Sequence, residues 1–284
     1  MSFPTSPPAT VAILTDFGTL DPYVGIMKGV IARIAPQARL VDLTHHIPPG
    51  DIRRAAFVLW QSYAYFPQGT VFLAVVDPGV GTARRALLLE CGGYRFIGPD
   101  NGLFTYLWHE KPGPAYELRH PAFRLPGVSA TFHGRDIFAP AAAYAALGVP
   151  GAAFGPRIEQ PRQFPLPACR VDAQRKVHGE VLHADHFGNL LTSLGLWQPG
   201  PQGWQLTPWL HQGPPVRLPP RAVRLPSGER VPIVTTFADL PPGQVGALVG
   251  STGLLELVVN GGSAARQTGL ASGDPVVLET ELLA

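Results

Sequence analysis

The stretch Val71 to Arg85, VFLAVVDPGVGTARR, combines residue types that could form a ligand site. Residues 71–76 are an unbroken apolar run, which predicts a strand buried on both faces. Asp77 follows at once, and then come two glycines and the pair Arg84 and Arg85. Ligands of open α/β sheets bind beyond the carboxyl ends of the strands, and glycines let the backbone come close to them. The alternative is a tight strand-to-helix turn with a surface ion pair.

Further polar clusters are spaced along the chain. They are Thr15-Asp16-Phe17-Gly18, Gly98-Pro99-Asp100-Asn101-Gly102, Thr131-Phe132-His133-Gly134-Arg135-Asp136 and Asp185-His186-Phe187-Gly188-Asn189. The first of them follows a short apolar run, so its carboxylate is expected at the edge of the same sheet as Asp77. Asp100 and Asn101 fit either a structural turn or a contact with the site. Arg135-Asp136 is expected to be an ion pair at a helix start.

The elements that must position these residues alternate between strand and helix. Strands are expected at 11–14, 40–43, 71–76, 86–90 and 94–97, the last two as a hairpin. Helices are expected at three places: from Asp21-Pro22 to 35, at 52–65 after an Asp51 cap, and at 137–147. Capping residues, proline at the first helical position and glycine after the last support these helix limits. The alternation predicts an α/β domain with a mostly parallel sheet flanked by helices.

The composition changes after residue 149, which suggests two domains. We expect a flexible arm at 1–10, an N-terminal α/β domain at 11–150, a Pro-rich linker at 151–168 and a C-terminal domain at 169–284. The last region has little helical periodicity. Short strands are expected at 177–184, 231–235, 245–249, 254–260 and 275–280, separated by glycine and proline. This pattern predicts a small all-β, barrel-like domain.

Composition and charge exclude several classes of protein. The 284-residue chain is 45% apolar and 15% charged, with a formal net charge of +2 and no basic block, which argues against nucleic acid as a partner. Cys91 and Cys169 give neither a disulfide framework nor a zinc pattern. No apolar run approaches the roughly 20 residues needed to cross a bilayer, and no signal peptide is evident at the start. We therefore expect a cytoplasmic protein.

Together, TDFG at 15–18, VVDPGVGTARR at 75–85, GPDNGL at 98–103, TFHGRD at 131–136 and DHFGN at 185–189 resemble one family. The chain resembles the S-adenosylmethionine (SAM) hydrolases, also called SAM hydroxide adenosyltransferases, which are relatives of the fluorinase and chlorinase enzymes. The resemblance covers nearly the whole chain. It implies an α/β domain followed by a barrel-like β domain, and a homotrimer that binds the nucleoside at a subunit interface. It implies neither a metal nor a redox cofactor.

The resemblance also implies roles for particular residues. The reacting centre maps onto Asp77, Arg84 and His133. The residues expected to bind substrate are Asp16 at the ribose, Thr131, Asp185 at the methionine amino group, Asn189 at the adenine, and Ser263 near the methionine carboxylate. Asp16 also fits a turn cap, and an Asp- and Asn-rich segment such as 185–189 also fits a structural turn.

Where the chain departs from the fluorinase, the changes favour water over halide. The fluorinase has a tyrosine in place of Asp77, a threonine in place of Val80, and a Tyr-Ser pair in place of His133-Gly134; its pocket-closing tryptophan aligns with Gly50. The prediction is therefore hydrolysis of SAM to adenosine and L-methionine. A chlorinase and a nucleoside-binding or sensing protein with little turnover are the alternatives. A methyltransferase is disfavoured because no GxGxG-type loop follows the first strand.

The expected chemistry is in-line attack of water at the ribose C5′, with the sulfonium as leaving group. Asp77 is the obvious proton acceptor, but an adjacent arginine favours its ionised form and makes it a weak base. We therefore expect Asp77, Arg84 and His133 to hold and polarise the water together. The proton then leaves late, through Asp77 or His133. The neighbouring His45 and His46 point opposite ways on a strand end, so they do not predict a metal site.

Overall fold

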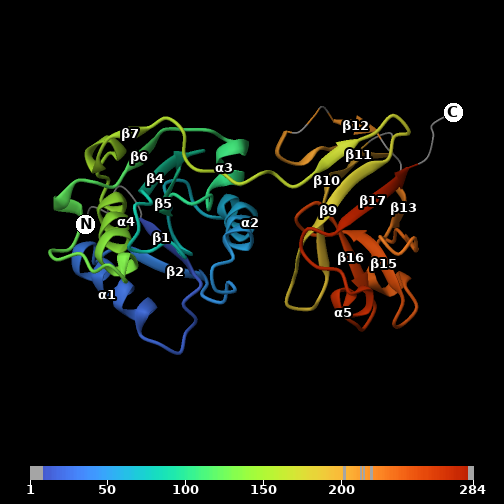
Figure 1. The fold of residues 1–284 in the computed structure, drawn as a ribbon, viewed down its shortest axis with the longest axis horizontal. Coiled ribbons are helices and arrows are strands. Elements are labelled where there is room, and N and C mark those ends of the chain that lie inside the picture. The colour runs from blue at the N-terminus through green and yellow to red at the C-terminus, as the bar shows by residue number, and fades with distance from the viewer. Residues whose placement is uncertain (1–8, 201–202, 212, 214, 218–219, 281–284) are drawn as a thin grey trace, which may run out of the picture. The chain divides into compact units, whose positions relative to one another are not determined.

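The computed structural model describes residues 9–200, 203–211, 213, 215–217 and 220–280. The chain divides into two compact units, Met1–Phe164 and Pro165–Ala284, and each unit is described by itself (Figure 1). Of the arm expected at residues 1–10, the first eight lie outside the described residues. Thr10 already belongs to the first strand.

The first unit alternates strands and helices. Its elements are β1 (Thr10–Thr15), α1 (Tyr23–Ile34), β2 (Arg39–Thr44), α2 (Ile52–Ser62), η1 (Tyr63–Tyr65), β3 (Val71–Val75), β4 (Ala86–Cys91), β5 (Tyr94–Pro99), α3 (Thr105–Glu110), β6 (Ala115–Glu117), η2 (Pro121–Phe123), η3 (Gly134–Phe138), α4 (Ala139–Ala146), η4 (Gly151–Phe154) and β7 (Arg157–Ile158). The last two fall within residues 151–168, where we expected a linker, and β7 pairs with β6.

The sheet of the first unit, which we expected to be mostly parallel, is instead mixed, with the strand order β2-β1-β3-β5-β4-β6-β7. The pairs β2–β1, β1–β3 and β3–β5 are parallel. β4 pairs antiparallel with β5, as a hairpin, and with β6. Parallel pairing therefore covers the part of the sheet that ends at the expected site, while the hairpin and the strands beyond it reverse direction.

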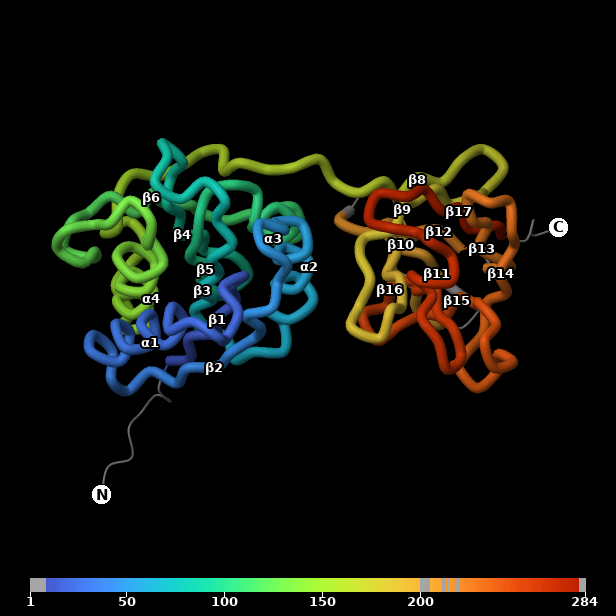
Figure 2. Tube along the Cα trace, turned by 60° about the horizontal axis from the view of Figure 1, so that its bottom comes forward, coloured from blue at the N-terminus to red at the C-terminus, as the bar shows by residue number. Residues whose placement is uncertain are grey.

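Helices cover both faces of this sheet. Figures 1 and 2 show α1 and α4 on one face and α2 and α3 on the other. Alternate residues of β1 enter the two cores: Val11 and Ile13 pack on the side of α1 and α4, whereas Ala12 and Leu14 pack on the side of α2 and α3. This double burial explains why the central strands are unbroken apolar runs.

One expected helix cap is wrong and another is confirmed. α1 begins at Tyr23 with Pro22 as its N-cap residue and no side-chain cap, because helical bonding already starts from the Pro22 carbonyl, so Asp21 does not cap it. The Asp51 side chain does cap α2, accepting from the Arg54 backbone N–H at 3.0 Å. Among the described residues, the helices are too short or too polar to cross a membrane.

The second unit is built mainly of strands. Its elements are β8 (Cys169–Val171), β9 (Val177–Ala184), β10 (Leu190–Gly200), β11 (Gly203–Thr207), η5 (Trp209–His211), β12 (Val216–Arg217), β13 (Pro220–Arg224), β14 (Arg230–Pro232), η6 (Phe237–Asp239), β15 (Val245–Val249), β16 (Leu254–Val259), α5 (Ala264–Thr268) and β17 (Pro275–Thr280).

All the strand-to-strand ladders of the second unit are antiparallel. The main path is β12-β11-β10-β9-β17-β13-β14, and β16 joins β15 to β10. Along β9 buried and half-buried residues alternate, which fits a strand with one face in the core. An α/β unit followed by a unit of antiparallel strands is therefore the architecture that the sequence predicts.

Candidate active site

Asp16 and Asp77 lie just beyond the carboxyl ends of two neighbouring strands of the first sheet. β1 and β3 are parallel neighbours in which Thr15 lies opposite Val75. Every residue of β3 is buried, so the apolar strand fixes the point at which the chain turns polar. The carboxyl ends of parallel strands are the usual place for a ligand site.

The loop from Asp77 to Arg85, called the catalytic loop below, folds back on itself. The Thr82 hydroxyl donates to the Gly79 carbonyl oxygen at 2.7 Å. Gly81 has φ +77°, and a Cβ at this position would lie 2.4 Å from the Ala130 carbonyl oxygen. Only glycine therefore allows the loop to pack this closely on the segment that leads to His133.

The structure brings Asp77, Arg84 and His133 together. Arg84 Nε lies 2.9 Å from both Asp77 carboxylate oxygens, and Nη2 also bonds Oδ2. The same Nη2 donates to His133 Nδ1 at 2.7 Å. The Asp77 and Arg84 side chains are each only 5% exposed. A buried ion pair of this kind survives only with good geometry and further hydrogen bonds, which His133 supplies.

The contact with Arg84 fixes the state of His133. A guanidinium only donates, so Nδ1 must accept and the ring proton of the neutral imidazole lies on Nε2. Burial, and next the charge of Arg84, lower the pKa of His133 below its ordinary 6.5. His133 is therefore neutral at pH 7, with Nε2–H as its remaining donor.

His133 lies at the start of η3, a π-helix over Gly134–Phe138. Asp136 within it is 2% exposed and accepts from the Ser129 backbone N–H at 2.9 Å and from Arg135 Nε at 2.6 Å. The expected Arg135–Asp136 ion pair is thus present. The bond from Ser129 to Asp136 ties the preceding loop to the helix start and so helps to orient His133. Thr131 in that loop is exposed, and its hydroxyl lies 3.2 Å from that of Ser129.

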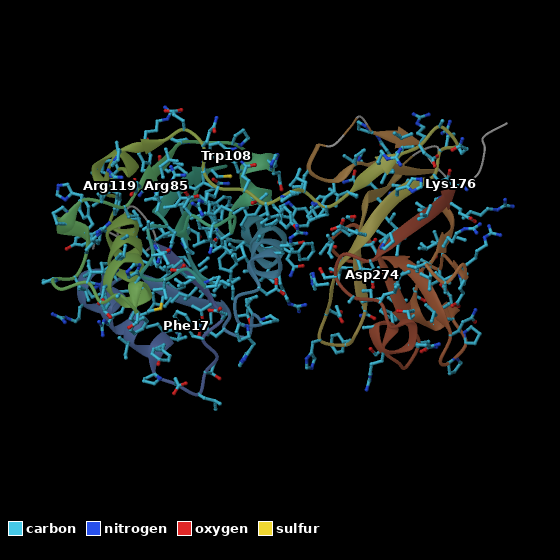
Figure 3. The ribbon with its side chains drawn as sticks, viewed as in Figure 1. Phe17, Arg85, Trp108, Arg119, Lys176 and Asp274 are labelled. Atoms are coloured by element: carbon cyan, nitrogen blue, oxygen red, sulfur yellow. The ribbon has the colours of Figure 1, made fainter. Side chains whose placement is uncertain are left out.

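Asp16 is held by the loop after β2. Its Oδ2 accepts from the Gly50 backbone N–H at 2.8 Å, which orients the carboxylate and leaves Oδ1 with lone pairs to spare. The next residue, Phe17 (labelled in Figure 3), packs edge-on against Phe132 with ring centroids 6.2 Å apart. The loop that carries Asp16 thus packs against the loop that carries His133.

His45 contacts Thr15, the residue before Asp16. His45 Nδ1 is 2.9 Å from the Thr15 hydroxyl, and Nε2 is 3.0 Å from Asp42 Oδ1. The order of hydroxyl, imidazole and carboxylate is that of a catalytic triad, but Thr15 is 0% exposed and His45 is 5% exposed. These groups therefore join the ends of β1 and β2. Among the described residues, no three His, Cys, Asp or Glu side chains gather as a metal site would need.

Asp185, Asn189 and Ser263 lie together in the second unit. Asp185 Oδ1 accepts from the backbone N–H groups of Phe187 and Asn189, and Oδ2 accepts from Asn189 Nδ2 at 2.9 Å. A Cβ on Gly188 would lie 2.0 Å from the Ser263 hydroxyl oxygen, and Ser263 caps α5. The geometry thus explains these side chains as parts of a turn and a helix cap. Asn189 is 7% exposed.

Two further polar residues lie beside these groups: Asn101, which fitted either a structural turn or a contact with the site, and Glu256, which was not singled out from the sequence. Asn101 donates to the Val76 carbonyl oxygen, one residue before Asp77. Glu256 lies near Asp185, and burial followed by the Asp185 charge raises its pKa to about 7. A lone glutamate inside the apolar strand LLELVV was the signal that could have identified it.

Comparisons with known proteins agree over nearly the full chain. The family models described as the SAM hydroxide adenosyltransferase N-terminal and C-terminal domains match residues 11–155 and 179–277. A Thermus thermophilus protein named (R)-S-adenosyl-L-methionine hydrolase is 44% identical, over 94% of this chain and 98% of its own. A Nocardia brasiliensis fluorinase is 28% identical, over 93% and 94%. The crystal structure of an uncharacterised Thermotoga maritima protein matches with a TM-score of 0.81 at 33% identity, covering 94% of this chain and 99% of that chain.

Proposed function

This chain belongs to the SAM hydroxide adenosyltransferase family, and from that premise we propose that it hydrolyses S-adenosyl-L-methionine to adenosine and L-methionine. The observation that carries the proposal is the hydrogen-bonded Asp77–Arg84–His133 set at the carboxyl end of the parallel strands, in which the Asp77 and Arg84 side chains are buried. The identity to a protein named as a SAM hydrolase, 44%, exceeds that to the fluorinase, 28%.

The reaction needs little chemistry beyond placing one water. The oxygen of water forms a bond to the ribose C5′ while the C5′–S bond breaks. The bonding pair stays on sulfur, which turns the positive sulfonium into the neutral thioether of methionine. One proton of the water remains on the new 5′-hydroxyl, and the other leaves to the enzyme and then to solvent. Holding water and C5′ in line can account for much of the rate.

The three side chains divide the work. Asp77 accepts the departing proton on Oδ1, which takes one bond from Arg84 and keeps a free lone pair, whereas Oδ2 takes two. Arg84 holds the carboxylate in place and stabilises the hydroxide character that develops on the water. The Nε2–H of His133 donates to the water oxygen and orients it. Since Nδ1 already accepts from Arg84, the proton route runs through Asp77 rather than His133.

Substrate binding is assigned to residues from both units. Asp16, oriented by Gly50, accepts from the ribose hydroxyls. Thr131 lies in the loop before His133 and faces solvent, where a nucleoside can reach it. Asp185 is assigned to the methionine amino group, Asn189 to the adenine edge and Ser263 to the methionine carboxylate. These last assignments rest on the family resemblance, because the local bonds of the three side chains are also those of a turn.

The rest of the proposal concerns assembly and location. We propose a homotrimer with the nucleoside at a subunit interface, a cytoplasmic location, and closure of the second sheet into a barrel-like domain. The domain limits 11–150 and 169–284 belong to the same proposal. Light scattering of the purified protein tests the trimer directly.

The deciding experiment is incubation of the purified protein with SAM in water enriched in ¹⁸O, followed by chromatography and mass spectrometry. Attack at C5′ places the label in the 5′-hydroxyl of adenosine and none in methionine. A parallel incubation with chloride tests for 5′-chloro-5′-deoxyadenosine, which would identify a chlorinase. Bound adenosine without any product would instead identify a binding or sensing protein.

A further inference from the structure

The catalytic loop carries Asp77 at its start and Arg84 near its end. It joins β3 to β4, two strands that do not pair with each other, because β5 lies between them in the sheet. The loop must therefore cross over the end of β5. The residues that follow β5, Asp100 and Asn101, lie where the crossing occurs.

Asn101 fixes the start of the loop. Its Nδ2 donates to the Val76 carbonyl oxygen at 2.9 Å, immediately before Asp77. Its Oδ1 accepts from the Leu103 backbone N–H at 3.2 Å, which sets the orientation of the amide. Both polar atoms of the Asn101 amide are thus hydrogen-bonded, and its Nδ2 bonds to the residue before Asp77.

Asp100 fixes the end of the loop. Its backbone N–H donates to the Arg85 carbonyl oxygen at 3.0 Å, and its Oδ2 accepts from Arg85 Nε at 2.7 Å. Its Oδ1 accepts from the Arg162 backbone N–H at 2.7 Å, and the carboxylate is 1% exposed. Arg85, labelled in Figure 3, also donates to the Gln160 carbonyl oxygen at 3.0 Å. Asp100 therefore joins the residue next to Arg84 to the chain at 160–162.

We propose that Asp100 and Asn101 are positioning residues that hold the two ends of the catalytic loop and so set the geometry between Asp77, Arg84 and His133. This inference rests on the proposed function. The two adjacent side chains bond to Arg85 and Val76, the residues that flank the Asp77–Arg84 segment, while neither bonds to Asp77, Arg84 or His133 in the interactions described above. They thus act on the chemistry through the backbone.

The test is the variant Asn101→Ala, assayed for SAM hydrolysis. Releasing the Val76 carbonyl lets Asp77 shift, and displacements near 1 Å in a positioned group can cost about 100-fold in rate. We expect kcat to fall by about 10- to 100-fold while KM for SAM changes less than about threefold. The acid limb of the pH profile of kcat/KM should also move, because the Arg84–His133 contact shifts with the loop.

The matched control is Thr70→Val, at the opposite end of the same strand. The Thr70 hydroxyl donates to the Pro67 carbonyl oxygen at 2.7 Å, and Thr70 is 1% exposed. The control therefore loses one buried bond from a side chain to a backbone carbonyl without touching the catalytic loop. We expect its kcat and pH profile to match those of the wild-type protein, with thermal unfolding of each variant measured alongside.

Asn101→Asp is another variant that keeps the shape and the Oδ1 acceptor but lacks the donor. Its kcat should fall as that of Asn101→Ala does. If the alanine variant does not fold, Asn101→Asp takes its place in the test. Wild-type kcat in either folded Asn101 variant, or an equal loss in Thr70→Val, overturns the inference while leaving the proposed function intact. A wild-type protein that makes no adenosine overturns the proposed function, and this inference with it.

Discussion

The catalytic loop in the first unit resembles the Asp185–Asn189 turn in the second unit as sequence, since each is a polar turn next to a strand. Their bonds differ. Asp77 pairs with Arg84 seven residues away, and Arg84 reaches His133 a further 49 residues on. In the part of the chain that the structure describes, the Asp185 carboxylate bonds only within its own turn, to groups of Phe187 and Asn189.

This difference distinguishes polar side chains that stabilise a turn from those that folding alone does not explain. A turn that satisfies its own backbone N–H groups needs no further explanation, because such bonds are the usual reason for aspartate in turns. Burying the two charges of Asp77 and Arg84 against the half-buried imidazole of another loop costs free energy, and neither loop requires it for its own folding. The long-range set is therefore the stronger evidence for a catalytic site, whereas the local set is explained by the turn alone.

The largest expected effect comes from Asp77→Asn. An amide cannot take the proton of the attacking water, so kcat should fall about 1,000-fold, within the range for a lost general base. The affinity for adenosine, measured by calorimetry, should change less than about threefold. Asp185→Asn provides the comparison in the other unit: KM should rise about tenfold with kcat nearly unchanged, as loss of a charged hydrogen bond predicts. An equal loss of kcat in both variants would contradict the assignment of Asp77 to catalysis and of Asp185 to binding.

Gly81→Ala should have the next largest effect. The new Cβ would meet the Ala130 carbonyl oxygen at 2.4 Å and push the catalytic loop away from the segment before His133. We expect kcat to fall about 100-fold. Gly148→Ala is the control, because Gly148 also has a positive φ, +89°, but nothing within 4 Å. Both variants carry about 1–2 kcal/mol of backbone strain, so only the clash distinguishes their turnover.

The pH profile should show the state of His133. Because its pKa is below 6.5 in the folded protein, kcat/KM should be flat around pH 7 and fall about tenfold per unit once pH drops below that pKa. The unfolded chain binds the proton first as pH falls, so the free energy of unfolding contributed by His133 also decreases below about pH 6.5. The acid limb should disappear in His133→Gln; its persistence there would assign the limb to another group.

The smallest effect is expected in the second unit, from Glu256→Gln. The folded-state pKa of Glu256, about 7, is above its ordinary 4.5. The folded protein therefore holds a proton that the unfolded chain releases between these values, and stability falls as pH rises through that interval. The variant removes this loss, so its Tm should exceed the wild-type value by a few degrees at pH 8. The difference should shrink towards pH 5, and an equal gain at both pH values would contradict the explanation.

Much of the fold could be predicted from the sequence, because burial leaves a pattern. Strands buried on two faces are unbroken apolar runs, and the limits expected for β15 and β17 agree with the structure. Short elements carry too few residues for a pattern. α3 has six residues, and β13 reads PRAVR, with no stretch of alternating apolar residues. Both were missed for this reason.

The site could be predicted as a set of residues but not as a set of bonds. Asp77, Arg84 and His133 were named from their motifs, yet spacing cannot show that Arg84 donates to Nδ1 and so leaves the proton on Nε2. Nor can it show that Asn101 reaches across the sheet to Val76. Such facts depend on how separate loops pack. Only the structure gives that packing.

Because of the π-helix over Gly134–Phe138, the orientation of the His133 side chain depends on the number of residues in this segment. A π-turn amounts to one extra residue within an otherwise α-helical segment. Deleting Ile137 or Phe138, the two residues of this π-helix that lie outside the TFHGRD motif, would restore regular winding and rotate everything before it by about 100° around the helix axis. The His133 imidazole would turn away from the Arg84 guanidinium although the sequence motifs stayed intact. A relative that lost such a residue would therefore keep the motifs but not this arrangement of side chains.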